Sequence, residues 1–78
     1  MTLDEAKKIY PKLLAIYHDA ADLPAGYAVR EWYGLEPGEL LGAGLDLSHA
    51  RWIAWESGGT YKLPRDPKDD PVIVESWI

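Results

Sequence analysis

The absence of cysteine most constrains how this chain can fold, because the chain has only 78 residues. Domains of this size bury a small core and often depend on disulfides or bound metals. Stability must instead come from apolar burial, and hydrophobic residues make up 47% of the sequence. Four Trp and five Tyr supply large side chains whose polar groups need partners. We predict a single small domain over residues 1–78, with an aromatic content that also suits a protein interface.

Residues 2–21 carry the pattern of an amphipathic helix. Thr2 and Glu5 have the spacing of a capping box, and apolar residues recur at spacings of three and four from Leu3 to Ala20. Pro11 lies on the polar side of this pattern, where a bend would wrap the helix around a core. We predict one kinked helix of about 18–20 residues. The alternative is a helix that begins at Pro11 after a short turn.

Two later segments predict strands. Residues 27–33, "YAVREWY", are rich in aromatic and β-branched residues. Residues 72–78, "VIVESWI", begin with apolar side chains on both faces, which indicates a strand that is central or covered by a partner. Between them, Gly42 and Gly44 leave only a short helix near 37–43, since each glycine costs a helix interior about 1 kcal/mol.

The segment from Ser48 to Lys62, "SHARWIAWESGGTYK", fits a β-hairpin with Gly58 and Gly59 in a two-residue turn. Lys62 would then lie over the Trp55 ring, a contact worth about 0.5–1 kcal/mol when exposed. We prefer this interpretation because its register sorts the side chains into two sensible faces. The core face would hold Trp52, Ala54, Tyr61 and Leu63, and the other face Ile53, Trp55, Thr60 and Lys62.

These segments together predict an α+β fold, in which a long N-terminal amphipathic helix packs on a small three- to four-stranded antiparallel sheet. Residues 64–71 are polar and bracketed by prolines, and we expect them to form a loop. The predicted strands lie near 27–33, 51–57, 60–64 and 72–78.

The spacing of residues 40–77 also resembles a winged helix-turn-helix. In that alternative Ser48 caps a second helix, Trp52 and Trp55 anchor it, and the remaining residues form a two-stranded wing. Arg51 would be the only fixed cation that this helix presents to DNA. Base readout and phosphate anchoring require several polar and basic side chains, so the side chains fit DNA less well than the spacing does.

The charge of the chain argues against nucleic-acid binding. Thirteen acidic and eight basic residues give a net charge of −5, and the basic residues beyond residue 12 occur singly. Nucleic-acid binders gain much of their affinity by neutralising phosphates with Lys and Arg. An acidic chain is better suited to a basic partner.

No set of residues predicts catalysis, a cofactor or a metal site. His18 and Asp22 lie four residues apart, but metal sites need three or four ligands. Ser48 and His49 are adjacent, which rarely aligns a hydroxyl with an imidazole. The glycines of residues 34–44 lack the Lys-Ser/Thr ending of a phosphate-binding loop, and the acidic loop near residue 70 lacks the spacing of a calcium loop. We therefore predict a protein that is not an enzyme.

We also expect a cytoplasmic protein. The N-terminal residues lack the basic flank and apolar run of a signal peptide. No apolar stretch approaches the ~18–20 residues of a membrane span. A chain without cysteine fits a reducing compartment.

The predicted function is that of a small acidic protein-binding module. Size and charge suggest an inhibitor or adaptor of a mobile element, such as a phage, that docks on a basic or nucleic-acid-binding surface of its partner. One alternative is a winged-helix DNA-binding protein, and a weaker one is a subunit of a homo-oligomer whose C-terminal strand pairs across chains. The residues predicted to bind a protein are Ile53, Trp55, Lys62, Asp66, Asp69 and Asp70.

Overall fold

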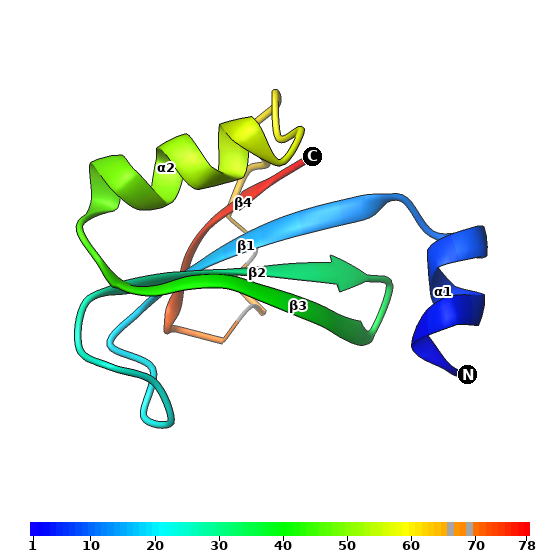
Figure 1. Ribbon diagram of the computed structural model, residues 1–78, viewed down its shortest axis with the longest axis horizontal. Helices are drawn as coiled ribbons and strands as arrows, with labels where there is room; N and C mark the ends of the chain where they lie inside the picture. The colour runs from blue at the N-terminus through cyan, green and yellow to red at the C-terminus, as the bar shows by residue number, and fades with distance from the viewer. Residues whose placement is uncertain (66, 69) are drawn as a thin grey trace.

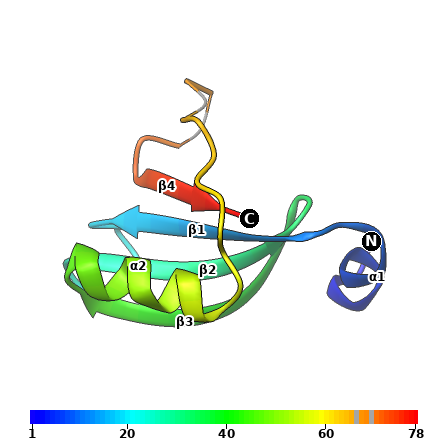
Figure 2. The same cartoon turned by 90° about the horizontal axis from the view of Figure 1, so that it is seen from above.

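A four-stranded antiparallel sheet forms the centre of the protein, with one helix across a face and another at one end (Figures 1 and 2). The computed structural model describes residues 1–65, 67–68 and 70–78. The strand order in the sheet is β3-β2-β1-β4. The predicted α+β class and antiparallel sheet are therefore confirmed. The elements are α1 (Leu3–Ile9), β1 (Lys12–His18), β2 (Tyr27–Tyr33), β3 (Glu36–Leu45), α2 (Leu47–Glu56) and β4 (Ile73–Trp77).

The prediction of a long N-terminal helix is wrong. The capping box is present, with Glu5 N donating to Thr2 Oγ1 over 3.3 Å, but α1 ends at Ile9. Pro11 lacks the N–H that would continue the helix, and β1 begins at the next residue. Residues 13–17 are apolar at every position, which suits a strand in contact with other residues on both faces as well as it suits a helix. The alternative of a helix that begins at Pro11 is also wrong.

The strand β2 has the bounds that the sequence predicts. It turns into β3 through Gly34 and Leu35, and Gly34 has a φ of +62°, which suits the first central position of a type II′ turn. The short helix expected near 37–43 is absent, because these residues belong to β3. The pairing of β3 with β2 is irregular and shifts register at three places. Such bulges accommodate a glycine-rich strand.

The hairpin expected at 51–57 and 60–64 is wrong, because residues 47–56 form the helix α2. Asp46 caps α2, and its Oδ1 accepts a hydrogen bond from His49 N over 2.7 Å. Ala50 and Ala54, one helical turn apart, are completely buried against the sheet. The winged-helix alternative is also wrong, since the residues before α2 form β3 and not a first helix.

The core lies between α2 and the inner face of the sheet. Leu14 and Ile16 of β1 and Val29 of β2 are its largest fully buried side chains. Ile16 lies directly opposite Val29 in the sheet, so both point toward α2. The small side chains of Ala50 and Ala54 let the helix approach these residues closely.

The predicted C-terminal strand is confirmed as β4, which lies at the end of the sheet order. The outer edge of β4 is covered by the chain itself. Thr60 N and Tyr61 N both donate to Ile78 O, and Leu63 N donates to Ser76 O over 2.8 Å. The segment 60–63 therefore runs beside β4, and not beside residues 51–57 as the hairpin would require.

Candidate functional site

The outward side of α2 carries two exposed tryptophans. Trp52 is 56% exposed and Trp55 is 62% exposed. Residues three apart on a helix are neighbours on its surface, so the two indoles form one patch, which we call the α2 tryptophan surface. The ring of His49 lies 6.1 Å from that of Trp52, centroid to centroid. Large exposed aromatic groups of this kind are typical of sites that bind a partner.

The packing of α2 determines which residues form this surface. Ala50 and Ala54 face the sheet, and a helix turns by about 100° per residue. Trp52 and Trp55 therefore point away from the core. Beyond the C-terminal end of α2, Tyr61 and Ile78 are also exposed, at 60% and 44%.

The four tryptophans divide into two pairs by the hydrogen bonds of their indole N–H groups. Trp32 Nε1 donates to the Tyr17 hydroxyl over 2.6 Å, and Trp77 Nε1 donates to Glu75 Oε1 over 3.1 Å. Neither Trp52 nor Trp55 donates a hydrogen bond to any residue that the structure describes. The N–H groups of the α2 tryptophan surface are thus available to water or to a partner.

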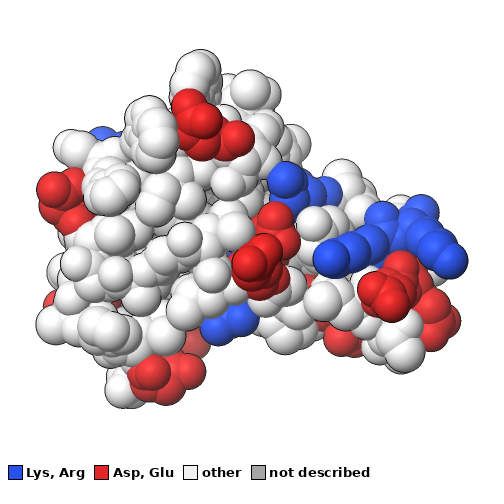
Figure 3. Space-filling model, in the orientation of Figure 1, with Lys and Arg blue, Asp and Glu red and all other residues white. Residues whose placement is uncertain are grey.

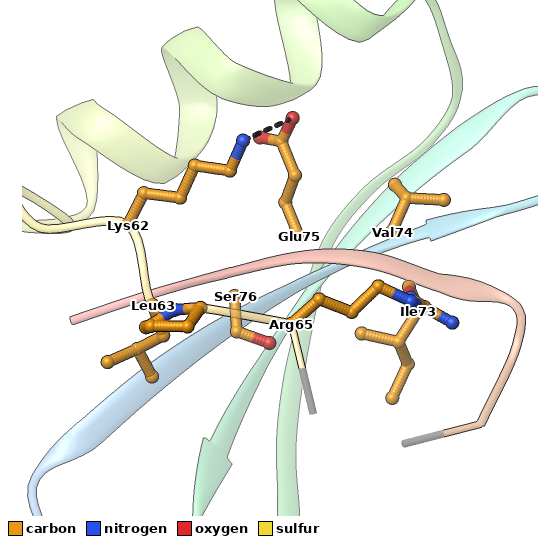
Figure 4. Close-up of a pocket in the computed structure, with 8 residues that line it drawn as sticks. Lys62, Leu63, Arg65, Ile73, Val74, Glu75 and Ser76 are labelled. Atoms are coloured by element: carbon orange, nitrogen blue, oxygen red, sulfur yellow. Dashed lines mark hydrogen bonds and ion pairs between the residues drawn. The ribbon is translucent and has the colours of Figure 1, made fainter. Parts of the chain in front are cut away.

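A buried carboxylate holds α2 on the edge of the sheet. Glu75 of β4 is only 8% exposed, and Arg51 Nε lies 3.1 and 3.0 Å from its two carboxylate oxygens. Lys62 Nζ lies 3.7 Å from Glu75 Oε2, as Figure 4 shows. The hydrogen bonds from Arg51 are the main cause that lowers the pKa of Glu75. This cluster fixes the orientation of α2 and therefore the position of its tryptophans.

The cleft in Figure 4 lies between residues 62–65 and β4 and has a volume of about 510 Å³. The charged side chains along it are engaged within the chain. Lys62 pairs with Glu75, and the Arg65 guanidinium donates a hydrogen bond to Ile73 O. This cleft therefore joins the segment 62–65 to β4, and the described residues that line it provide no free charged group that would bind a ligand.

The opposite face of the sheet forms a second apolar surface, which no helix covers within the described ranges (Figure 1). Leu13, Trp32 and Ile73 line a groove of about 690 Å³ on this face. Leu35 at its rim is 93% exposed. The volume of this groove is suited to a small apolar ligand.

Farther along the same face, Tyr17, Arg30 and Trp32 line a hollow of about 470 Å³. Burial raises the pKa of the Tyr17 hydroxyl, and the hydrogen bond from Trp32 partly offsets this effect. Arg30 Nη1 donates to Gly38 O over 3.0 Å. Tyr17, Arg30 and Trp32 thus bind each other or the backbone, and among the described residues they do not form a nucleophile–base pair.

Known proteins provide no guide to these surfaces. No protein-family model matches the chain, and neither a curated protein nor a solved structure shows significant similarity to it. In the part of the chain that the structure describes, no helix is long and apolar enough to cross a membrane.

The structure separates the residues predicted to bind a partner. Trp55 is exposed as expected, but Ile53 packs against the core from the inward side of α2. Lys62 pairs with Glu75 and not with the Trp55 ring. Asp70 accepts a hydrogen bond from Val72 N over 3.1 Å within a turn. Asp66 and Asp69 lie outside the described residues.

Sequence analysis missed Trp52, which the hairpin placed in the core together with Tyr61. The signal that identifies it is helical spacing: Leu47, Ala50 and Ala54 form an inward stripe, and Trp52 and Trp55 lie on the other side.

The structure also shows the positions of the two residue pairs that were considered for metal binding and catalysis. The His18 ring stacks on Tyr27, with centroids 4.4 Å apart, and its Nε2 lies 3.4 Å from Asp19 and makes no ion pair with Asp22. Ser48 lies in the first turn of α2, but the N-cap is Asp46.

Proposed function

We propose that this protein is a small binding module that docks on another protein through Trp52 and Trp55. The observation that carries this proposal is that both indoles are exposed and that their N–H groups have no partner among the described residues. Tryptophan is among the residues that contribute most to binding at protein interfaces. On this view the protein acts by binding and does not catalyse a reaction.

The charges support a basic partner. Basic side chains beyond residue 12 bind acceptors within the chain. Arg30 donates a hydrogen bond to Gly38 O, and Arg51 forms an ion pair with Glu75. Several carboxylates have no hydrogen bond or ion pair to any described residue, so they give the surface negative charge that favours a basic partner. These carboxylates are Asp4, Asp22, Glu36, Glu39 and Glu56.

The charges are also unevenly distributed. Figure 3 shows Lys and Arg side chains together with Asp and Glu side chains over α1, while the face formed by α2 and the sheet is largely uncharged with carboxylates at its margins. Asp4 and Glu5 lie in the first turn of α1, and Lys7 and Lys8 lie in its last turn. A partner that meets the α2 tryptophan surface therefore meets a largely uncharged face bordered by carboxylates. This arrangement fits an inhibitor or adaptor that covers a basic or nucleic-acid-binding surface.

The proposal is tested by affinity capture with the wild-type protein and the double variant Trp52→Ala/Trp55→Ala. The matched control is Leu35→Ala, which truncates an even more exposed apolar residue at the β2–β3 turn. We expect a partner that the wild type and the control retain and the double variant loses. Circular dichroism verifies that all three proteins are folded. Retention of the same partner by the double variant would show that the proposed surface is wrong.

A further inference from the structure

We infer that the α2 tryptophan surface binds arginine side chains of its partner, with the guanidinium stacked on the indoles of Trp52 and Trp55 and paired with Glu56. This inference rests on the proposed function and specifies the chemistry of the partner. A guanidinium is planar, stacks on aromatic faces and donates hydrogen bonds to a carboxylate at the same time.

The helix places Trp55 and Glu56 on either side of Trp52. Trp55 follows Trp52 by three residues and Glu56 follows it by four, so both neighbour Trp52 on the helix surface. Glu56 is exposed and forms no ion pair with any residue that the structure describes. Exposed indole rings beside an uncompensated carboxylate are complementary to a cation.

The basic residue nearest in sequence does not neutralise this site. Arg51 lies on the same helix, but its Nε and Nη2 atoms are bound to the Glu75 carboxylate of β4. The negative charge of Glu56 therefore remains available to a cation from outside the protein.

A second copy of this chain does not supply the guanidinium. The chain has three arginines, and each of them contacts an acceptor of its own fold. Arg30 donates to Gly38 O, Arg51 binds Glu75, and Arg65 donates to Ile73 O. Acidic or phosphate-bearing partners are also disfavoured, because Glu56 and the net charge of −5 repel them. The complementary ligand is thus an arginine-bearing segment of a different protein.

The test uses the indole N–H signals in proton–nitrogen correlation spectra, assigned with single Trp→Phe variants. The probe is a short Arg-Gly repeat peptide, with two matched peptides that carry citrulline or lysine in place of arginine. We expect the arginine peptide to shift the Trp52 and Trp55 signals and to leave those of Trp32 and Trp77 in place, because the latter two donate to internal acceptors. The lysine peptide should shift the same signals less, and the neutral citrulline peptide should have no effect.

The variant Glu56→Gln should weaken binding of the arginine peptide about two- to fivefold, as expected of an exposed ion pair. Glu39→Gln removes another exposed carboxylate, on β3, and should leave the affinity unchanged. Equal shifts with the citrulline peptide, an absence of shifts, or an unchanged affinity of Glu56→Gln would each overturn the inference.

The two proposals can fail separately. If capture of a partner depends on Trp52 and Trp55 but the arginine peptide does not bind, the binding module stands and the arginine site is wrong. If the arginine peptide binds but capture is the same without the two tryptophans, the arginine site stands and the proposed function is wrong.

Discussion

Arg51 of α2 and Glu75 of β4 form a hydrogen-bonded ion pair that joins the helix to the edge strand of the sheet. The side chain of Arg51 is 48% exposed, whereas the side chain of Glu75 is 6% exposed. The carboxylate also accepts a hydrogen bond from Trp77 Nε1 and lies near Lys62. Three donors from separate parts of the chain thus converge on one buried acceptor, and this convergence holds the α2 tryptophan surface in place.

We expect Glu75→Gln to lower the free energy of unfolding by about 1–3 kcal/mol, because the change removes the buried charged acceptor of Arg51, Lys62 and Trp77. Urea unfolding monitored by circular dichroism measures this difference. Glu39→Gln is the control, since that carboxylate is exposed and has no ion pair with a described residue. If both variants unfold at the same urea concentration, the Glu75 cluster does not contribute to stability.

Acid should destabilise the protein through Glu75. Its pKa in the folded protein lies below the ordinary value of 4.5, chiefly because Arg51 donates hydrogen bonds to the ionised form. The ionised carboxylate therefore stabilises the fold above pH 4.5, and this contribution is lost as the pH falls toward the lowered folded pKa. We expect the stability difference between the wild type and Glu75→Gln to shrink over this range. A difference that stays constant from neutral to acidic pH would contradict the assignment.

Tyr17→Phe should reduce stability by about 1–2 kcal/mol, because it leaves the half-buried Trp32 N–H without its acceptor. The indole signal of Trp32 should move toward the position of a solvent-exposed N–H. Tyr61→Phe is the control, as Tyr61 is 60% exposed and its hydroxyl has no hydrogen bond to a described residue. Equal stability of the two variants would show that the Tyr17–Trp32 hydrogen bond contributes nothing.

The orientation of α2 can be tested with two substitutions on one helix. Ala50→Leu forces a larger side chain into a fully buried position and should cost about 1–3 kcal/mol. Trp52→Leu changes an exposed residue and should alter stability by less than about 0.5 kcal/mol. Thermal or urea unfolding measures both. The opposite order of effects would mean that α2 presents a different face to the sheet.

The local sequence was sufficient to predict an element correctly where its residues favoured a single secondary structure. The capping box at Thr2, the strand at Tyr27–Tyr33 and the C-terminal strand were predicted from residue types and alternation, and all three are present. The exposure of Trp55 was also predicted.

Other segments satisfied two patterns at once. Residues 13–17 are apolar throughout, so they fitted a helix and a buried strand equally well. In residues 51–56 the choice between strand and helix changes the side-chain period from 2 to 3.6. That change moves Trp52 from the core to the surface and Ile53 from the surface to the core.

The sequence by itself determined the α+β class, the acidic charge, and a core built without disulfides. Only the tertiary structure decided that α1 ends before Pro11, that β3 replaces a helix, and that residues 47–56 are helical. The physical reason is that these choices depend on contacts between distant residues. Ala50 and Ala54 pack on Leu14, Ile16 and Val29, and Arg51 reaches Glu75, so the partners that select the helix lie on other strands.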